Sequence, residues 1–175
     1  AHVDFERVAE AKTHALRTAF GRFDASDAAF KAFCRRETDW LPDFALFLAL
    51  KHAHGQKTWT DWDPDLAARK PRALARARKE LADEILYHQF VQYVFDAQFN
   101  RLRARAKERG LGFIGDVPIF VAQDSADVWT HPELFELDDE GRPTVVAGVP
   151  PDYFSATGQL WGNPLYRWSV HAESG

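Results

Sequence analysis

Side chains that could bind a sugar are concentrated in the last third of the chain. Asp and aromatic residues recur, together with one Asn, in the stretch from Gly115 to Trp168. Aromatic rings provide flat faces for the apolar side of a pyranose, and carboxylate and amide groups can hydrogen-bond to its hydroxyls. Within this stretch a short apolar run ends at Asp116, and prolines and glycines that indicate loops follow it. The pattern favours a carbohydrate site.

Tryptophan is used in two different settings. Trp161 lies between Leu160 and a Gly-Asn-Pro turn signal, and we predict that it takes part in the site. Trp129 precedes the loop-rich region, and we predict that it fills the core instead. The choice matters because only an exposed indole can serve as a sugar platform.

Other candidate chemistries fail on spacing. Asp61, Asp63 and Asp65 resemble the start of a calcium loop, but its sixth and twelfth positions carry Leu66 and Arg72 instead of Gly and Glu. His52 and His54 point to different faces of a helix, and His88 is far along the chain, so zinc is not expected. No phosphate loop is present. We expect no metal and no cofactor.

Two further groups have structural explanations. Asp124, Asp127 and Glu133 could imitate paired catalytic carboxylates, but Asp124 and Ser125 precede a short helical stretch and are expected to cap it. Cys34, the only cysteine, lies in a helical run and is expected to be a small buried residue.

The first 110 residues are predicted to be helical. Apolar residues at helical spacing predict helices over 5–23, capped by Asp4, over 27–36, capped by Ser26, and over 41–53. A long helix is predicted from Pro71 to about Arg109, with a kink or join near 87–92, and Gly110 ends it. The basic run 69–79 is read as the solvated face of this helix.

The pattern changes after Leu111. Residues 112–116 are predicted to form a short buried strand that ends at Asp116, with a hairpin tip at 138–142 and a return strand at 144–146. A polar residue at a strand's C-terminal end is where a TIM barrel places its active site. The predicted fold class is therefore α/β: part of a TIM barrel with a large helical insertion. Eight strands cannot be drawn from this sequence.

Composition restricts the partners. The net charge is −4 and the isoelectric point is about 6.0, which argues against nucleic acid. The sequence holds no apolar run of about 18 residues, so no membrane span is expected. One cysteine fits a reducing compartment, and a cytoplasmic location is expected.

Several motifs together resemble one family. They are Val3–Glu6, Trp40–Phe47, Lys51–Gly55, Glu80–Ile85, Gly115–Ala122 and Ala122–Trp168, of which Val149–Pro164 is the most specific part. These segments resemble the amylomaltases, the 4-α-glucanotransferases of glycoside hydrolase family 77, over residues 1–168. The tail 169–175 departs from the acidic helix start expected there. The implied domains are a helical insertion at 1–110 and a barrel strand with active-site loops at 111–168.

The resemblance implies transfer of α-1,4-glucan segments between maltooligosaccharides by a retaining double displacement. Such a mechanism needs two carboxyl groups about 5–5.5 Å apart. In the family, the nucleophilic Asp, the acid/base Glu and a third Asp all follow the segment that matches Asn163–Trp168. No catalytic residue is therefore assigned here, and all three are expected beyond Gly175. The sequence is expected to be a fragment, inactive alone.

The resemblance also implies six substrate-binding residues and a role for each. Asp116 would hydrogen-bond the sugar at the cleavage point or support the catalytic residues. Asp152, Tyr153 and Phe154 would close over the glucan, and Trp161 and Asn163 would line the donor side. From the residues alone, Asp116 could be a helix cap and Pro150–Phe154 a packed surface loop.

Three hypotheses remain open at this stage. The chain is part of a 4-α-glucanotransferase, or a non-catalytic glucan-binding module, or a helical interaction domain with an incidental sugar-like loop. The second predicts maltooligosaccharide binding that is lost in Trp161→Ala. The third predicts no saccharide binding and a stable fold from residues 1–110 alone.

Overall fold

The computed structural model describes residues 2–174, which form two compact units. The first unit comprises residues 2–45 and 81–114, and the second comprises residues 46–80 and 115–174. Helix α3 (Leu41–Ala53) begins in the first unit and ends in the second. Each unit is built differently, the first from helices alone and the second from short helices and a strand pair.

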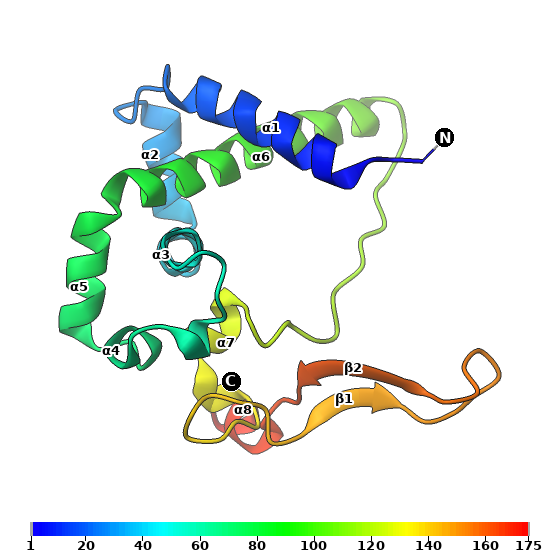
Figure 1. The fold of residues 1–175 in the computed structure, drawn as a ribbon. Coiled ribbons are helices and arrows are strands. Elements are labelled where there is room, and N and C mark those ends of the chain that lie inside the picture. The colour runs from blue at the N-terminus through cyan, green and yellow to red at the C-terminus, as the bar shows by residue number, and fades with distance from the viewer. Residues whose placement is uncertain (1, 175) are drawn as a thin grey trace. The chain divides into compact units, whose positions relative to one another are not determined.

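Three helices make up most of the first unit: α1 (Phe5–Phe20), α2 (Ala28–Arg36) and α6 (Ala82–Glu108). The long α6 packs against α1 and α2 (Figure 1). The predicted cap of α1 is confirmed, since the Asp4 carboxylate accepts the N–H of Arg7 at 3.0 Å. The predicted cap Ser26 is wrong. Asp27 caps α2, and Ser26 donates its hydroxyl to Asp24 instead.

Aromatic side chains hold the three helices together. Phe23 lies 4.7 Å from Phe90 and 5.0 Å from Phe30, ring centre to ring centre. Arg17 forms a two-bond ion pair with Glu84 and covers the ring of Tyr87. Tilted and edge-on ring contacts of this kind add to the hydrophobic burial. The predicted helical periodicity corresponds to the core only in part, because α1 has no buried residue and Phe95, Phe99 and Leu102 of α6 are exposed.

The second unit contains short elements and one strand pair. They are η1 (Trp59–Asp61), α4 (Pro64–Ala67), α5 (Pro71–Glu80), α7 (Ala126–Thr130), η2 (Pro132–Leu134), β1 (Val146–Val149), β2 (Gln159–Pro164) and α8 (Trp168–Ser174). Trp129 is fully buried at the centre, against Phe47 and Trp62. Its indole N–H donates to the carbonyl of Leu66 at 3.2 Å. The predicted core role of Trp129 is confirmed.

The long helix predicted from Pro71 to Arg109 is two helices. Pro71 does start α5, but the chain leaves helical geometry at Leu81, and α6 follows. The join was expected near residues 87–92. Charge agrees with this position. Arg78 and Lys79 lie at the partly negative C-terminal end of α5, and Asp83 and Glu84 lie at the partly positive N-terminal end of α6, so both pairs are placed favourably. Gly110, with φ +71°, follows the end of α6 as predicted.

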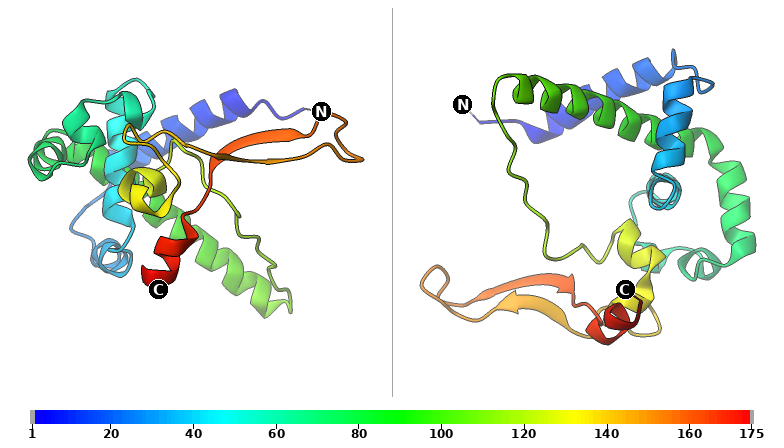
Figure 2. Two further views of the ribbon diagram at one scale, coloured as in Figure 1. Left: turned by 90° about the horizontal axis from the view of Figure 1, so that it is seen from below. Right: turned by 180° about the vertical axis from the view of Figure 1, so that it is seen from behind.

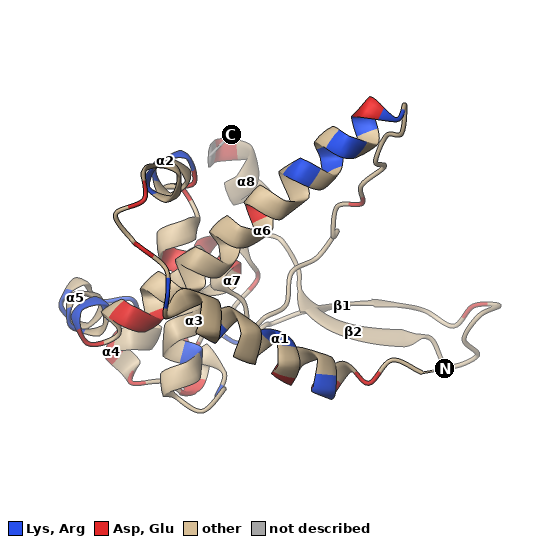
Figure 3. Ribbon diagram, turned by 90° about the horizontal axis from the view of Figure 1, so that it is seen from above, with Lys and Arg blue, Asp and Glu red and all other residues tan. Residues whose placement is uncertain are grey.

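The basic run 69–79 is a solvated face along α5 but not throughout. Ala73, Leu74 and Ala77 are buried, while Arg72, Arg76 and the other basic side chains of the helix are exposed. Arg69 precedes the helix, is half-buried and lies 4.3 Å from the ring centre of Trp129. Figure 3 marks Lys and Arg in blue along α5 and over the last turns of α6.

The buried strand predicted at 112–116 is not formed. Residues 111–118 have no regular secondary structure, and Phe113 and Ile114 are exposed. A strand needs a hydrogen-bonded neighbour, and within residues 2–174 no segment pairs with this one. Periodicity alone could not reveal that the partner is missing.

The predicted hairpin tip is confirmed. Leu137 pairs with Pro143, the N–H of Asp138 donates to the carbonyl of Arg142, and Gly141 has φ +76°. The return strand, predicted at 144–146, begins at Val146 as β1.

Two smaller expectations have different outcomes. Cys34 is half-buried, not buried, and the buried residues of α2 are Phe30 and Phe33. Within residues 2–174, no helix is both long and apolar enough to span a bilayer.

Candidate functional site

An antiparallel ribbon carries five of the six predicted site residues: Trp161 and Asn163 lie on β2, and Asp152, Tyr153 and Phe154 lie in the loop that joins the strands. In β1 and β2, Gly148 pairs with Leu160 and Val149 with Gln159, and the register shifts between Val146 and Gly148. The ribbon extends away from α7 and α8, as two views show (Figure 2). Between Pro143 and Tyr166 the only charged residue is Asp152. With a single charged residue, this surface suits a neutral ligand better than an ionic one.

The loop between the strands is closed by its own hydrogen bonds. Oδ1 of Asp152 accepts the N–H groups of Phe154 at 2.9 Å and Ser155 at 2.8 Å. The hydroxyl of Ser155 donates to the carbonyl of Gly158 at 2.7 Å. The carboxylate of Asp152 therefore shapes the loop, in the manner of an Asx turn. A role in holding the loop is what the structure shows, and direct contact with a sugar stays a prediction.

The turn that Asp152 fixes presents two aromatic rings to solvent. Tyr153 is 92% exposed and Phe154 is 85% exposed. Their ring centres are 4.6 Å apart and their planes make an angle of 73°. A packed surface loop would bury at least one of them, so the alternative of a packed Pro150–Phe154 loop is wrong for the described chain. Two exposed rings on an ordered turn are typical of a binding surface.

Trp161 adds a third ring on β2. It is 45% exposed, and its indole N–H donates to the side chain of Gln159 at 3.1 Å. Phe120 packs edge-on against it with a centre-to-centre distance of 6.1 Å. Leu160, on the other side of the strand, is 82% exposed. The indole is thus held in place while much of its surface stays open.

Asn163 and Asp116 occupy different environments. The side-chain N–H of Asn163 donates to the carbonyl of Val121 at 2.9 Å, which ties β2 to the segment before α7. Asp116 is exposed in the irregular segment, and within residues 2–174 no hydrogen bond or ion pair links it to another residue. It caps no helix. The structure therefore brings Trp161 and Asn163 together with Phe120 and Val121, and leaves Asp116 apart.

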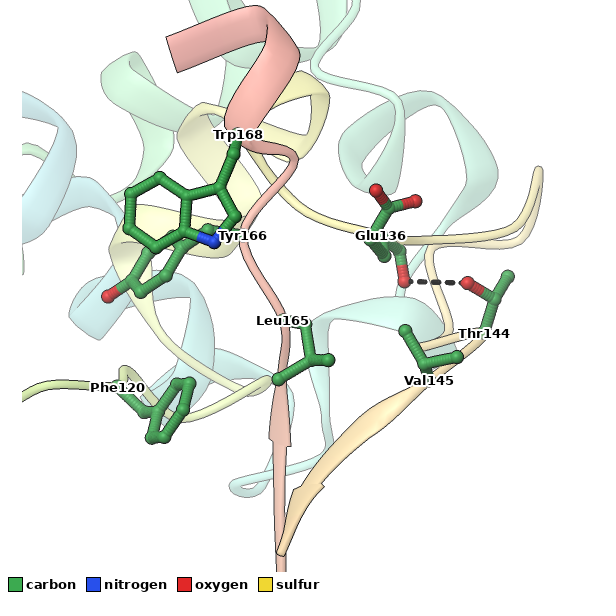
Figure 4. Close-up of a pocket in the computed structure, with 7 residues that line it drawn as sticks. All are labelled: Phe120, Glu136, Thr144, Val145, Leu165, Tyr166 and Trp168. Carbon is green, nitrogen blue, oxygen red and sulfur yellow. Dashed lines mark hydrogen bonds between the residues drawn. The ribbon is translucent and has the colours of Figure 1, made fainter. Parts of the chain in front are cut away.

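A pocket of about 470 Å³ opens beside the base of the ribbon. Figure 4 shows its lining, which consists of Phe120, Glu136, Thr144, Val145, Leu165, Tyr166 and Trp168. Tyr166 stacks on Phe120 at 6.2 Å, and the hydroxyl of Thr144 donates to the carbonyl of Glu136 at 3.1 Å. Trp168 is 70% exposed. Aromatic rings thus continue from Trp161 through Phe120 to Tyr166.

The sequence did not single out Phe120 or Tyr166. Both lie in recognised motifs, but an aromatic residue in a loop carries no signal for which face it will contact. Contacts between residues far apart in the sequence decide which face the ring meets, and Phe120 contacts both Trp161 and Tyr166. Within the described residues, no group of three or more His, Cys, Asp or Glu side chains could hold a metal ion.

Comparison with known families gives one consistent result. A family model described as 4-alpha-glucanotransferase matches residues 1–175. A 4-alpha-glucanotransferase from Thermus thermophilus is 52% identical over 178 residues, which cover 99% of this chain and 36% of that protein. One from Synechocystis is 46% identical and covers 99% of this chain and 35% of that protein.

Solved structures agree. An amylomaltase from Streptococcus agalactiae in complex with acarbose matches with a TM-score of 0.91 and 41% identity, over 98% of this chain and 35% of that chain. An amylomaltase from Corynebacterium glutamicum matches with a TM-score of 0.68 and 25% identity, over 95% of this chain and 21% of that chain. The chain spans about a third of the length of the curated relatives it matches, which agrees with the expectation of a fragment.

Proposed function

Because the chain belongs to the 4-alpha-glucanotransferase family, we propose that it supplies one wall of the glucan-binding cleft of an enzyme that transfers α-1,4-glucan segments between maltooligosaccharides. The chemistry would be a retaining double displacement, which requires a nucleophile and an acid/base. Neither is assigned to a residue of this chain. The proposal gives this chain binding and orientation, and gives bond cleavage to residues outside it.

One observation carries the proposal: a ribbon whose only charged residue is Asp152 holds three exposed aromatic rings in fixed positions. Tyr153 and Phe154 are presented by the turn that Asp152 closes, and Trp161 is braced by Phe120. A pyranose has apolar C–H faces and a rim of hydroxyls, so it stacks on rings and hydrogen-bonds at its edge. Tyr153 and Phe154 would close over the glucan, and Trp161 and Asn163 would line the donor side.

The barrel and the compartment are also part of this proposal. Residues 111–168 would lie at the active-site edge of a TIM barrel completed by the part of the longer relatives that this chain does not span. Asp116 would then lie near the sugar at the cleavage point. The single cysteine fits a reducing compartment, so we place the enzyme in the cytoplasm.

The test is a titration of the purified chain with maltoheptaose, followed by isothermal calorimetry and by the shifts of the tryptophan indole N–H signals. Cellohexaose, which is β-linked, serves as the linkage control. We expect saturable binding of maltoheptaose alone, and no products when maltotriose is incubated with the chain. An absence of binding would contradict the proposal and favour a helical interaction domain. Glucose and longer maltooligosaccharides from maltotriose would show that the chain is catalytically complete, against our assignment.

A further inference from the structure

Lys51 is a buried cation with a complete set of partners in the second unit. It lies in the last turn of α3 and is 9% exposed. Its ammonium donates to the carbonyls of Gln56 and Lys57 at 2.8 Å each, and to Oδ2 of Asp124 at 2.6 Å. An ammonium has three N–H bonds, so all of them are used. The group therefore has one strongly preferred position.

The partner carboxylate is tied down in turn. Oδ1 of Asp124 accepts the backbone N–H of Trp59 at 3.3 Å. The indole N–H of Trp59 donates to the carbonyl of Gln123 at 2.9 Å, and the Gln123 amide donates to the carbonyl of Gly141 at 2.7 Å. These bonds fix the backbone at residues 123–124 against the loop that follows α3.

The fixed backbone continues directly into the candidate site. Residues 120–124 form one short segment, held at one end by Lys51 and joined at the other end to β2. At that other end, the carbonyl of Val121 accepts the Asn163 amide and the ring of Phe120 packs on Trp161. The position of the segment thus determines where Asn163 and Trp161 can be held.

We propose that Lys51 and Asp124 are a positioning pair for the glucan-binding wall, which they act on through residues 120–124 and do not touch. The inference rests on the proposed function for its binding consequence. This ion pair is only partly buried, since the Asp124 side chain is 35% exposed, and such a pair adds little net stability because desolvation opposes the attraction. The pair instead fixes local geometry, because its hydrogen bond forms only when both side chains are in one arrangement.

Five substitutions, two of them controls, test the proposal in the 175-residue chain. Lys51→Met keeps the apolar stem and removes the charge, and Asp124→Asn keeps the shape of the carboxylate. Lys51→Arg retains a cation. Lys70→Met is the matched control, because Lys70 pairs with Asp65 at 2.5 Å on the exposed surface of the same unit. Leu66→Ala serves as a control for lost stability away from the pair.

Two readouts are measured at a temperature where circular dichroism shows each variant folded. The first is the side-chain amide signal of Asn163 in the ligand-free chain, with its exchange rate with water. The second is the dissociation constant for maltoheptaose. We expect Lys51→Met and Asp124→Asn to shift the Asn163 signal, to speed its exchange, and to weaken binding about tenfold. Lys51→Arg should change both less, and neither control should change them.

The outcomes separate the two proposals. An unaltered Asn163 signal in folded Lys51→Met and Asp124→Asn would overturn the positioning role, as would unfolding of both variants. If the unmodified chain does not bind maltoheptaose, the proposed function fails, and the Asn163 signal still decides the positioning role. Equal weakening in Leu66→Ala would also count against it, because lost stability would then suffice.

Discussion

The benzene edge of the Trp59 indole lies against Gly141, so closely that a β-carbon at Gly141 would lie 2.2 Å from Cη2 of the ring. Trp59 is 4% exposed, and Gly141 has φ +76°. The contact joins the loop after α3 to the hairpin tip that precedes β1. Glycine is needed here for two reasons, the backbone conformation and the space taken by the ring.

Replacing Gly141 should separate these two reasons. We expect Gly141→Ala to lower the free energy of unfolding by roughly 2–4 kcal/mol, as strain at positive φ adds to a clash with a buried ring. Gly55→Ala is the matched control, since Gly55 has φ +62° with nothing within 4 Å of an added β-carbon. It should cost about 1 kcal/mol. Urea unfolding measures both, and equal losses would show that the ring contact contributes nothing.

A second pair of glycines tests the loop that presents Tyr153 and Phe154. A β-carbon at Gly158 would lie 2.6 Å from the carbonyl of Val149, across the base of the loop, whereas one at Gly162 meets nothing within 4 Å. Both have positive φ. We expect Gly158→Ala to open the loop, shift the ring signals of Tyr153 and weaken maltoheptaose binding by more than Gly162→Ala does. Equal effects would mean that strain at φ alone sets the loop.

Trp129 should be far more costly to remove than Trp161. Trp129 is fully buried, donates a hydrogen bond to Leu66 and has Arg69 4.3 Å from its ring centre. Trp129→Ala should lower the free energy of unfolding by about 3–5 kcal/mol, whereas Trp161→Ala, at a half-exposed position, should cost much less. Chemical unfolding followed by far-ultraviolet circular dichroism compares them. Similar losses for the two variants would contradict the separate roles assigned to them.

The reactivity of Cys34 should depend on pH in a defined direction. Partial burial raises the pKa of its thiol, because desolvation penalises the thiolate. The thiolate fraction at neutral pH is then below that of a free cysteine, and alkylation is slower. We expect iodoacetamide to modify Cys34 more slowly than it modifies glutathione at pH 7.5, with the rate still rising at pH values where glutathione has levelled off. Faster modification of Cys34 at pH 7.5 would refute this.

Local signals in the sequence were enough for the helices and the hairpin tip. Asp4, Pro71 and Gly110 act within one turn of their own position, so their effects follow from residue type. The join in the long helix was predicted near residues 87–92 but lies at Leu81, because charge, not apolar spacing, marks its position. The strand at 112–116 was predicted from an apolar pattern that says nothing about the partner strand it needs.

The sequence pointed to the exposed residues of the candidate site but not to the residues that hold them in position. Tyr153, Phe154 and Trp161 were chosen for chemistry that their side chains carry themselves. Phe120 acts only through the neighbour that it contacts, and Lys51 meets Asp124 across 73 positions of chain. Pairings at that separation depend on the whole fold, so a single sequence gives no local signal for them.

The central claim is that an exposed ring of the ribbon binds α-1,4-glucan, and the most direct measurement is the affinity of Trp161→Ala for maltoheptaose. Trp40→Ala is the matched control, because Trp40 is 41% exposed and belongs to the first unit, whereas Trp161 is 45% exposed in the second. We predict that calorimetry will show binding reduced at least about tenfold in Trp161→Ala, as expected for the loss of one well-placed ring, and unchanged in Trp40→Ala. Unchanged affinity in a folded Trp161→Ala variant would contradict the account.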